Sequence, residues 1–242
     1  MKFPQKYWIP GCILFVLVTT ELTLRLAFGL GNPVLLQADP DTGYRFQPNQ
    51  KVVRFGNTIE YNQYSQRSKP ITEQKPKGTL RILMVGDSII NGGNATNQEQ
   101  TIPELLAKKI LASGHSSEVL NASAGSWGIG NRLGYLHEFG IFESDAVIVQ
   151  IGTYDLTQPT STSEPVGHHP SYPDRRPILA IQEAFTRYIL PQLSLIFRLN
   201  SPPAQVAPSA TEVERQFQEN MQDLKEIATL VRAKNAQIFV LF

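Results

Sequence analysis

Three short apolar runs in this chain each stop at small residues that could do chemistry. They lead into Gly-Asp-Ser at 86–88, Ser-Ala-Gly-Ser at 123–126 and Gly-Thr-Tyr-Asp at 152–155. Short runs of apolar and β-branched residues are typical of buried strands, and open α/β sheets bind their ligands at the carboxyl ends of such strands. The pattern predicts that the three segments meet at one edge of a parallel sheet.

Ser88 has the clearest chemical use, because it follows Gly86 and Asp87 directly after the first run. It is a candidate nucleophile. A serine hydroxyl needs a base to take its proton, typically a histidine that a carboxylate orients. We expect Asp87 to accept backbone N–H bonds in the turn rather than to orient that base.

The other two segments could stabilise the intermediate that a serine nucleophile forms. Gly125 has no side chain, so its backbone N–H can approach a ligand closely. Together with the N–H of Ser88, it could donate to a tetrahedral oxyanion. Asp155 could belong to the site or act as a structural hydrogen-bond acceptor, and both roles stay open here.

The four histidines give no clear base. His115 lies in a Gly-Ser loop and is expected to be exposed, and His137 falls on a predicted helix, at the surface or between helices. His168 and His169 precede a proline, but neither has an aspartate three positions earlier. The pair also lacks an obvious third metal ligand, so we expect no metal site.

The three segments, taken in order, resemble the SGNH subgroup of the GDSL esterase and lipase family across residues 80–242. The resemblance implies that Ser88 is the nucleophile and that Gly125 supplies an oxyanion N–H. Tyr154 stands where the family has an asparagine whose amide is another oxyanion donor. Its hydroxyl could reach the oxyanion, or its ring could cover the pocket as a lid. Asp155 matches the aspartate of the same block.

The resemblance also implies a fold and an activity. The fold would be a three-layer α/β/α arrangement around a parallel, doubly wound sheet, which the alternation of predicted strands and helices favours independently. The activity would be that of a serine ester hydrolase or acyltransferase, without a cofactor. Its substrate would be an ester-bearing small molecule or a polysaccharide, such as an acylated carbohydrate.

The family's fourth block, Asp-x-x-His, is absent from the 242 residues. One interpretation is an enzyme whose reading frame continues past Phe242 and encodes the block within roughly 30 to 80 residues. The apolar strand at 238–242 favours it, because an unpaired edge invites aggregation. The other is a non-catalytic accessory or binding protein on the same fold. A nucleotide-binding domain is disfavoured, because neither Gly-x-Gly-x-x-Gly nor Gly-Lys-Ser/Thr follows the first run.

The pattern along the chain predicts three parts: a signal anchor or transmembrane helix over 1–32, an extended stalk or lead-in over 33–78, and the SGNH-like domain over 79–242. A short strand pair is expected at 51–61 of the stalk. In the domain, we expect an irregular loop at the mouth of the site, a helix over 178–188 that Pro191 breaks, and a Pro- and Ala-rich linker. The loop covers 157–177 and the linker 201–209.

The amino terminus predicts a single membrane crossing. Residues 8–20 are almost wholly apolar and 22–30 continue the stretch, which together approach the roughly 20 residues that span a bilayer. Glu21 and Arg25 are four apart and could pair on a helix. Lysines precede the segment and none follows it closely, so the body is expected outside the cytoplasm. A cleaved signal peptide or a buried helix are the alternatives.

Composition excludes other classes. The formal net charge of the 242 residues is +1, and no basic run interleaved with aromatics occurs, so nucleic acid is not an expected partner. Cys12 is the only cysteine, which rules out an internal disulfide and a cysteine-rich metal site. It lies in the apolar stretch and is expected to be a membrane-buried thiol.

Overall fold

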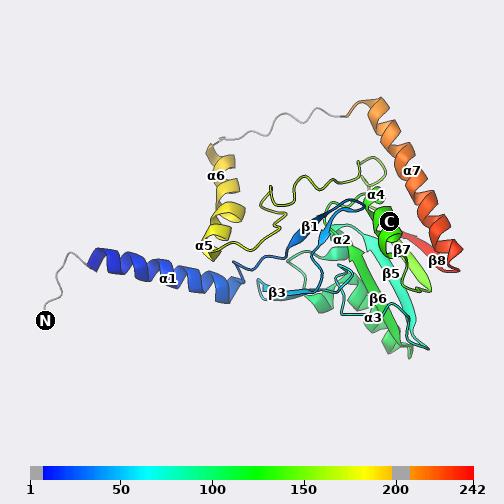
Figure 1. Cartoon of the computed structure of the whole chain (residues 1–242), viewed down its shortest axis with the longest axis horizontal. Coiled ribbons are helices and arrows are strands. Elements are labelled where there is room, and N and C mark those ends of the chain that lie inside the picture. Colours follow the sequence, from blue (N-terminus) through cyan, green and yellow to red (C-terminus); the bar gives the residue numbers. More distant parts are fainter. Residues whose placement is uncertain (1–7, 198–207) are drawn as a thin grey trace.

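The structure of the chain is a computed structural model that describes residues 8–197 and 208–242. The linker predicted over 201–209 lies almost wholly outside the described residues. Figure 1 shows an α/β body from which one long helix extends on the amino-terminal side.

A four-stranded parallel sheet forms the centre of the body, in the order β6-β5-β7-β8. Its strands are β5 (Leu80–Gly86), β6 (Ser117–Ser123), β7 (Ala146–Gln150) and β8 (Gln237–Leu241). From β5 the chain first adds β6 on one side and then β7 on the other. The carboxyl end of β5 is therefore the point at which the strand order reverses, where such sheets open a crevice for ligands.

Alternate residues of the central strand enter two different cores. Leu83 and Val85 pack toward α4 (Ile129–Phe139) and α7 (Ala210–Ala233), whereas Ile82 and Met84 pack toward α3 (Ile102–Ala112). Successive side chains of a strand point to opposite faces, so a strand that is apolar throughout must be covered on both. The predicted three-layer α/β/α fold is confirmed.

Residues 33–78 differ from the expected extended stalk. They form two antiparallel hairpins, β1 (Leu36–Asp39) with β2 (Gly43–Phe46) and β3 (Gln50–Arg54) with β4 (Asn57–Tyr61). The predicted strand pair at 51–61 is present. The segment also packs, because Tyr44, Ile59 and Tyr61 are almost fully buried. The apolar residues that anchor it are few and far apart, which explains why no periodicity announces them.

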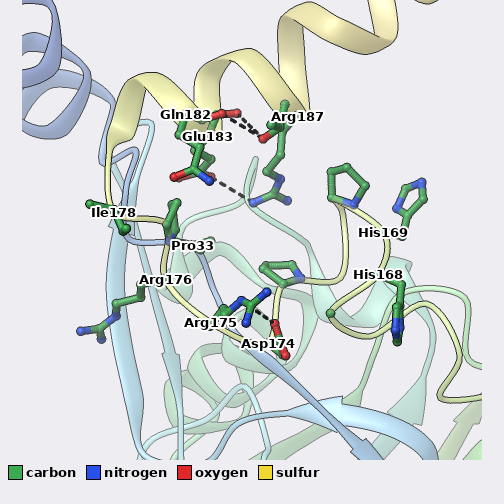
Figure 2. Close-up of a pocket in the computed structure, with 15 residues that line it drawn as sticks. Pro33, His168, His169, Asp174, Arg175, Arg176, Ile178, Gln182, Glu183 and Arg187 are labelled. Atoms are coloured by element: carbon green, nitrogen blue, oxygen red, sulfur yellow. Dashed lines mark hydrogen bonds and ion pairs between the residues drawn. The ribbon is translucent and has the colours of Figure 1, made fainter.

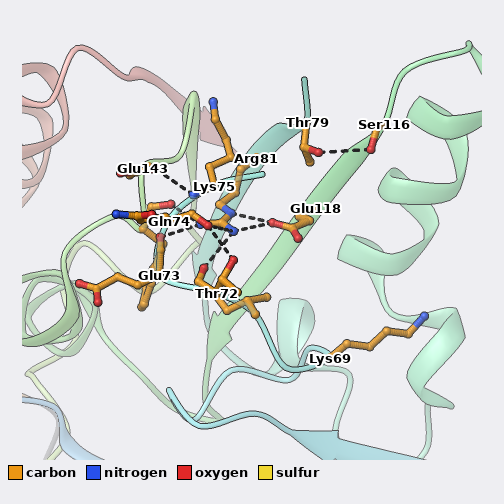
Figure 3. Close-up of polar contacts among 12 residues, drawn as sticks. Lys69, Thr72, Glu73, Gln74, Lys75, Thr79, Arg81, Ser116, Glu118 and Glu143 are labelled. Atoms are coloured by element: carbon orange, nitrogen blue, oxygen red, sulfur yellow. Dashed lines mark hydrogen bonds and ion pairs between the residues drawn. The ribbon is translucent and has the colours of Figure 1, made fainter. Parts of the chain in front are cut away.

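The residues after β4 are held to the sheet by Arg81 of β5. Figure 3 shows its guanidinium inside a ring of acceptors. It donates to the carbonyl oxygens of Thr72 at 3.0 Å, Glu73 at 3.0 Å and Phe142 at 2.7 Å, and Nε lies 2.7 Å from Glu118 Oε2. Arg81 is fully buried, so these bonds replace all of its hydration.

Two further helices lie outside the three layers. One is α1 (Trp8–Phe28), which is long and apolar enough to cross a membrane. The other is a continuous helix over 180–197, made of α5 (Ala180–Glu183), a π-helical segment (Ala184–Ile189) and α6 (Leu190–Phe197). Pro191 lies inside α6, so the prediction that it breaks the helix was wrong. The wider π-helical turn before it relieves the clash that a proline ring makes with the preceding turn.

We predict that Arg81→Met lowers the free energy of unfolding by about 3 to 5 kcal/mol, because it leaves buried acceptors without their donor. Lys75→Met is the control. Lys75 pairs with Asp145 at the surface, where such a pair contributes about 0 to 1 kcal/mol. Urea denaturation of the two variants measures the difference. Equal midpoints would contradict a structural role for the Arg81 cluster.

Candidate active site

Ser88 is the first residue of a four-residue helix, α2 (Ser88–Asn91), directly after β5. Asp87 caps this helix, with Oδ1 accepting from the N–H of Ile89 at 2.7 Å, which is the turn role expected of it. The turn needs a glycine before it. A Cβ at Gly86 would lie 2.6 Å from Ile90 Cγ1 and 2.8 Å from Gln150 Oε1. In the Gly-Asp-Ser sequence, Gly86 thus allows the tight turn, Asp87 caps the helix and Ser88 supplies the hydroxyl.

Ser88 and Gly125 line the same cavity, which has a volume of about 150 Å³. Val34, Leu36, Phe46 and Tyr61 contribute to its walls. Among the described residues, the N–H groups of Ser88 and Gly125 donate no hydrogen bond to another protein atom. The structure thus places the predicted nucleophile and the predicted oxyanion glycine on one cavity, and the backbone N–H groups of both are available to a ligand.

Tyr44 of β2 fixes the loop that carries Gly125. Its hydroxyl donates to the carbonyl oxygen of Gly125, and its own carbonyl accepts from Trp127 Nε1 at 2.8 Å. Burial and the neighbouring Tyr172 raise the pKa of Tyr44 above its ordinary value, so the phenol keeps the proton that it donates. Ser126 takes a φ of 62°, which turns the chain sharply after the glycine.

A second set of contacts holds α2 against β6. Asn91 Nδ2 donates to the carbonyl oxygen of Ser123 at 2.9 Å, and Asn91 Oδ1 accepts from the Tyr61 hydroxyl at 3.2 Å. Burial raises the pKa of Tyr61, which keeps this donor protonated. Arg67 Nη1 donates to the carbonyl oxygen of Asn91 at 2.7 Å. Ser88 therefore begins a helix whose last residue is tied on three sides.

Asp155 has the contacts of a structural acceptor. It is buried beside Arg132, whose Nη2 lies 2.6 Å from Asp155 Oδ2, and the same oxygen accepts from the N–H of Gly152 at 2.9 Å. Arg132 also donates to the carbonyl oxygens of Gln150 at 2.5 Å and Trp127 at 2.9 Å. One guanidinium thus joins the loops after β6 and β7. The N–H of Gly152 is used within this network.

Tyr154 is not part of the cavity that Ser88 lines. Its side chain is 77% exposed, and its ring covers no part of the wall formed by the residues around Ser88. Tyr154 therefore does not supply an oxyanion donor to this cavity in place of the family's asparagine.

No histidine of the described residues lines the cavity beside Ser88. His115 is exposed, and His137 lies at the surface, 2.8 Å from Glu226. His168 and His169 line a neighbouring cavity of about 570 Å³, between the 167–178 loop and α5 (Figure 2). Arg187 lines both cavities. Ser171, from the irregular loop, lines the cavity beside Ser88.

Three residues that position the site escaped the sequence analysis. They are Tyr44, Arg67 and Arg132. For Tyr44 the sequence gives no signal, because the carbonyl oxygen of Gly125 that it binds lies 81 positions further along the chain. The two arginines carry no local signal, because Asn91 O, which Arg67 binds, and Gln150 O and the Asp155 carboxylate, which Arg132 binds, all lie far along the chain.

We predict that Asp155→Ala lowers the free energy of unfolding by about 3 to 5 kcal/mol, because it leaves the Arg132 charge buried without its partner. Asp174→Ala is the matched control. Asp174 is exposed and only 4.0 Å from Arg175, so its loss should change stability by less than about 0.5 kcal/mol. Thermal unfolding compares them. A fully stable Asp155→Ala protein would show that the carboxylate serves another purpose.

A search of curated proteins finds no match. Among solved structures, TesA is 18% identical with a TM-score of 0.36, over 66% of this chain and 58% of that chain, so the match spans less than two thirds of TesA. The SGNH-hydrolase family esterase AlinE4 is 18% identical with a TM-score of 0.31, over 68% and 77%. A variant of Axe2, an acetyl xylan esterase from Geobacillus stearothermophilus, is 14% identical with a TM-score of 0.29, over 69% of this chain and 78% of that chain.

The sequence profile of the GDSL-like lipase/acylhydrolase family matches residues 84–242, which is most of the chain. The protein belongs to that family.

Proposed function

We propose that the protein is a membrane-anchored serine ester hydrolase with Ser88 as its nucleophile. The observation that carries the proposal is the shared cavity of Ser88 and Gly125 at the point where the strand order reverses. Family membership supports hydrolysis of an ester.

In the proposed reaction, Ser88 Oγ attacks the ester carbonyl carbon while a general base takes the hydroxyl proton. The carbonyl oxygen becomes an oxyanion that accepts from the N–H groups of Ser88 and Gly125. A single donor of this kind lowers the barrier by about 3 to 4 kcal/mol. The oxyanion then collapses and the ester C–O bond breaks; the base gives its proton to the departing alcohol, and the acyl group stays on Ser88 Oγ. Water, or a second alcohol in an acyltransferase, attacks this acyl-enzyme with the same base accepting its proton, and Ser88 leaves with that proton. The base must come within hydrogen-bond reach of Ser88, and no described histidine lines that cavity.

The size and polarity of the cavity support a short acyl group on a polar alcohol. A cavity of about 150 Å³ holds a group about the size of benzene, which suits an acetyl group or a slightly longer chain. Asn94, Ser171 and Arg187 add polar groups to the wall. These groups suit an alcohol with several hydroxyls, so an acylated carbohydrate is the proposed substrate.

A second candidate is a non-catalytic binding or accessory protein on the same fold. Two observations favour it: no described histidine lines the cavity, and Tyr154 is exposed in place of an oxyanion asparagine. In this case the cavity would bind an ester without cleaving it. Binding would then survive the loss of the Ser88 hydroxyl.

The proposed anchor is α1, with the body outside the cytoplasm. The helix has 21 residues and a mean hydropathy of 1.7 over its most apolar part. At 1.5 Å per residue it is about 30 Å long, which matches the hydrocarbon thickness of a bilayer. The lysines at positions 2 and 6 support the orientation through the positive-inside rule.

We predict that Ser88→Ala lowers kcat/KM for a short-chain aryl ester by roughly 10⁴-fold or more in the full chain in detergent micelles. Ser116→Ala is the control and should keep the parent rate, because Ser116 is exposed and precedes β6, at the opposite end of the sheet from Ser88. Fluorophosphonate labelling should be lost only in Ser88→Ala. Labelling or hydrolysis that survives Ser88→Ala would remove Ser88 from the role. If the unmodified protein binds the ester without cleaving it, and Ser88→Ala binds it equally well, the protein is a binding protein instead.

We also predict that a reporter fused after Phe242 is active outside the cytoplasm, because the amino-terminal lysines keep that end inside. Alkaline phosphatase and a cytoplasm-specific fluorescent protein give opposite readouts of this orientation. Activity of the cytoplasmic reporter alone would reverse the proposed topology.

A further inference from the structure

The helix over 180–197 exposes its apolar side chains and buries its charges. Its only charged residues are Glu183 and Arg187, and both face inward. Large apolar side chains face away from the body, and the most exposed are Ile178 at 86%, just before the helix, and Ile196 at 71%. Phe185, Tyr188, Ile189 and Leu190 are also exposed. A helix on a water-facing surface has the opposite arrangement.

The spacing of these residues makes the apolar surface continuous. Phe185, Ile189 and Ile196 follow one another at steps of four and seven, which keeps side chains on one side of a helix, and Ile178 adds an exposed apolar side chain just before its amino end. Exposed apolar surfaces of this extent mark sites that contact a protein or a membrane. We call this set the 178–196 face.

The charges on the inner side hold the helix rigidly to the body. Glu183 is buried, and its Oε1 lies 2.5 Å from Arg54 Nη2 and 3.0 Å from Arg187 Nη1. Its Oε2 accepts from the N–H of Gly31 at 2.6 Å. Breaking a buried network of this kind is costly, so the 178–196 face has a fixed position relative to the residues that follow α1.

The helix is joined directly to α1 as well. Glu21 accepts from the N–H groups of Ala180 and Ile181 at 2.8 and 3.0 Å, and Arg25 Nη2 donates to the carbonyl oxygen of Ile178 at 2.8 Å. The acidic side chain therefore caps the amino end of the second helix, where its charge is favourable. Figure 1 shows α5 and α6 running across the direction of α1.

The depth of this junction fits the boundary of a bilayer. Glu21 lies 13 residues beyond Trp8, or about 20 Å along the helix, and Phe28 lies about 30 Å along it. Phe28, Phe55 and Tyr188 form an aromatic cluster there, with ring centroids 6.4 and 6.0 Å apart. Aromatic side chains concentrate at the boundary between lipid and water. The helix that carries the 178–196 face meets this cluster through Tyr188.

We propose that the 178–196 face lies in the plane of the bilayer's outer boundary as a second membrane contact, beside the crossing made by α1. The occupant of the face is lipid, at the junction of headgroups and acyl chains. The proposal rests on α1 being the membrane anchor. The lipid assignment follows from the junction with α1, the aromatic cluster and the transverse direction of the helix, and helices with one such side lie in this layer.

The contact would set where the site opens. Arg187 faces inward from this helix and lines the cavity that contains Ser88. With the opposite side of the helix in lipid, the mouth of that cavity lies next to the membrane surface. Esters carried at the bilayer surface would then reach Ser88 without a long diffusion path.

The test uses the full chain in phosphatidylcholine vesicles and an environment-sensitive fluorophore on single cysteines. In a Cys12→Ser background, Ile178→Cys and Ile196→Cys report on the face. Val16→Cys reports on the middle of α1. Leu111→Cys is the matched control, because this leucine is 65% exposed on α3, in the body. Lipids carry a quenching doxyl group either near the headgroup or near the chain end.

We expect the labels at 178 and 196 to emit at shorter wavelength and to lose most of their fluorescence to the shallow quencher. The label at 16 should respond to the deep quencher and the label at 111 to neither. Quenching at 16 without quenching at 178 and 196 would overturn the lipid contact and leave the anchor intact. No quenching at 16 would overturn the anchor itself. A blue shift at 196 that no lipid quenches would assign the face to a protein, such as a second copy, and would also overturn the proposal.

Discussion

The buried guanidinium of Arg132 is the constraint on which the arrangement of the strand-end loops depends. A buried charge is costly unless an ion pair and hydrogen bonds replace its hydration. Its partners here are Asp155 and the carbonyl oxygens at the ends of two loops. Because α4 carries the arginine, the packing of that helix on the sheet also fixes the loops that follow β6 and β7.

The fold followed from local features of the sequence. Strands that are apolar on both faces and helices between them predicted a parallel sheet in three layers, and the structure has it. The turn from Gly86 to Ser88 could be predicted for the same reason. The tight turn at the end of a buried strand needs particular residues at adjacent positions, and adjacency is visible in a sequence.

The supports of the site were not visible in this way. Arg67 binds carbonyl groups that any residue could supply, and Arg132 binds two such groups beside Asp155, a partner 23 positions away that nothing local connects to it. The hairpin over 36–46 was hidden for a related reason, since two buried apolar residues, Leu36 and Tyr44, anchor a segment that is otherwise mostly polar. The prediction for Pro191 was wrong because a π-helical segment before it accommodates the proline, and no single residue type predicts such a segment.

The contact between Tyr44 and Gly125 has a practical consequence for anyone who prepares a water-soluble form of the protein. A truncation that starts at residue 79, where the sequence suggests that the domain begins, would delete Tyr44, Tyr61 and Arg67 together. The glycine loop and the carboxyl end of α2 would then lose their fixed neighbours, although every residue of the Gly-Asp-Ser turn would still be present. A soluble form that keeps a shaped site must start ahead of the first hairpin, at or before Val34, so that the cut falls between the apolar helix and Leu36.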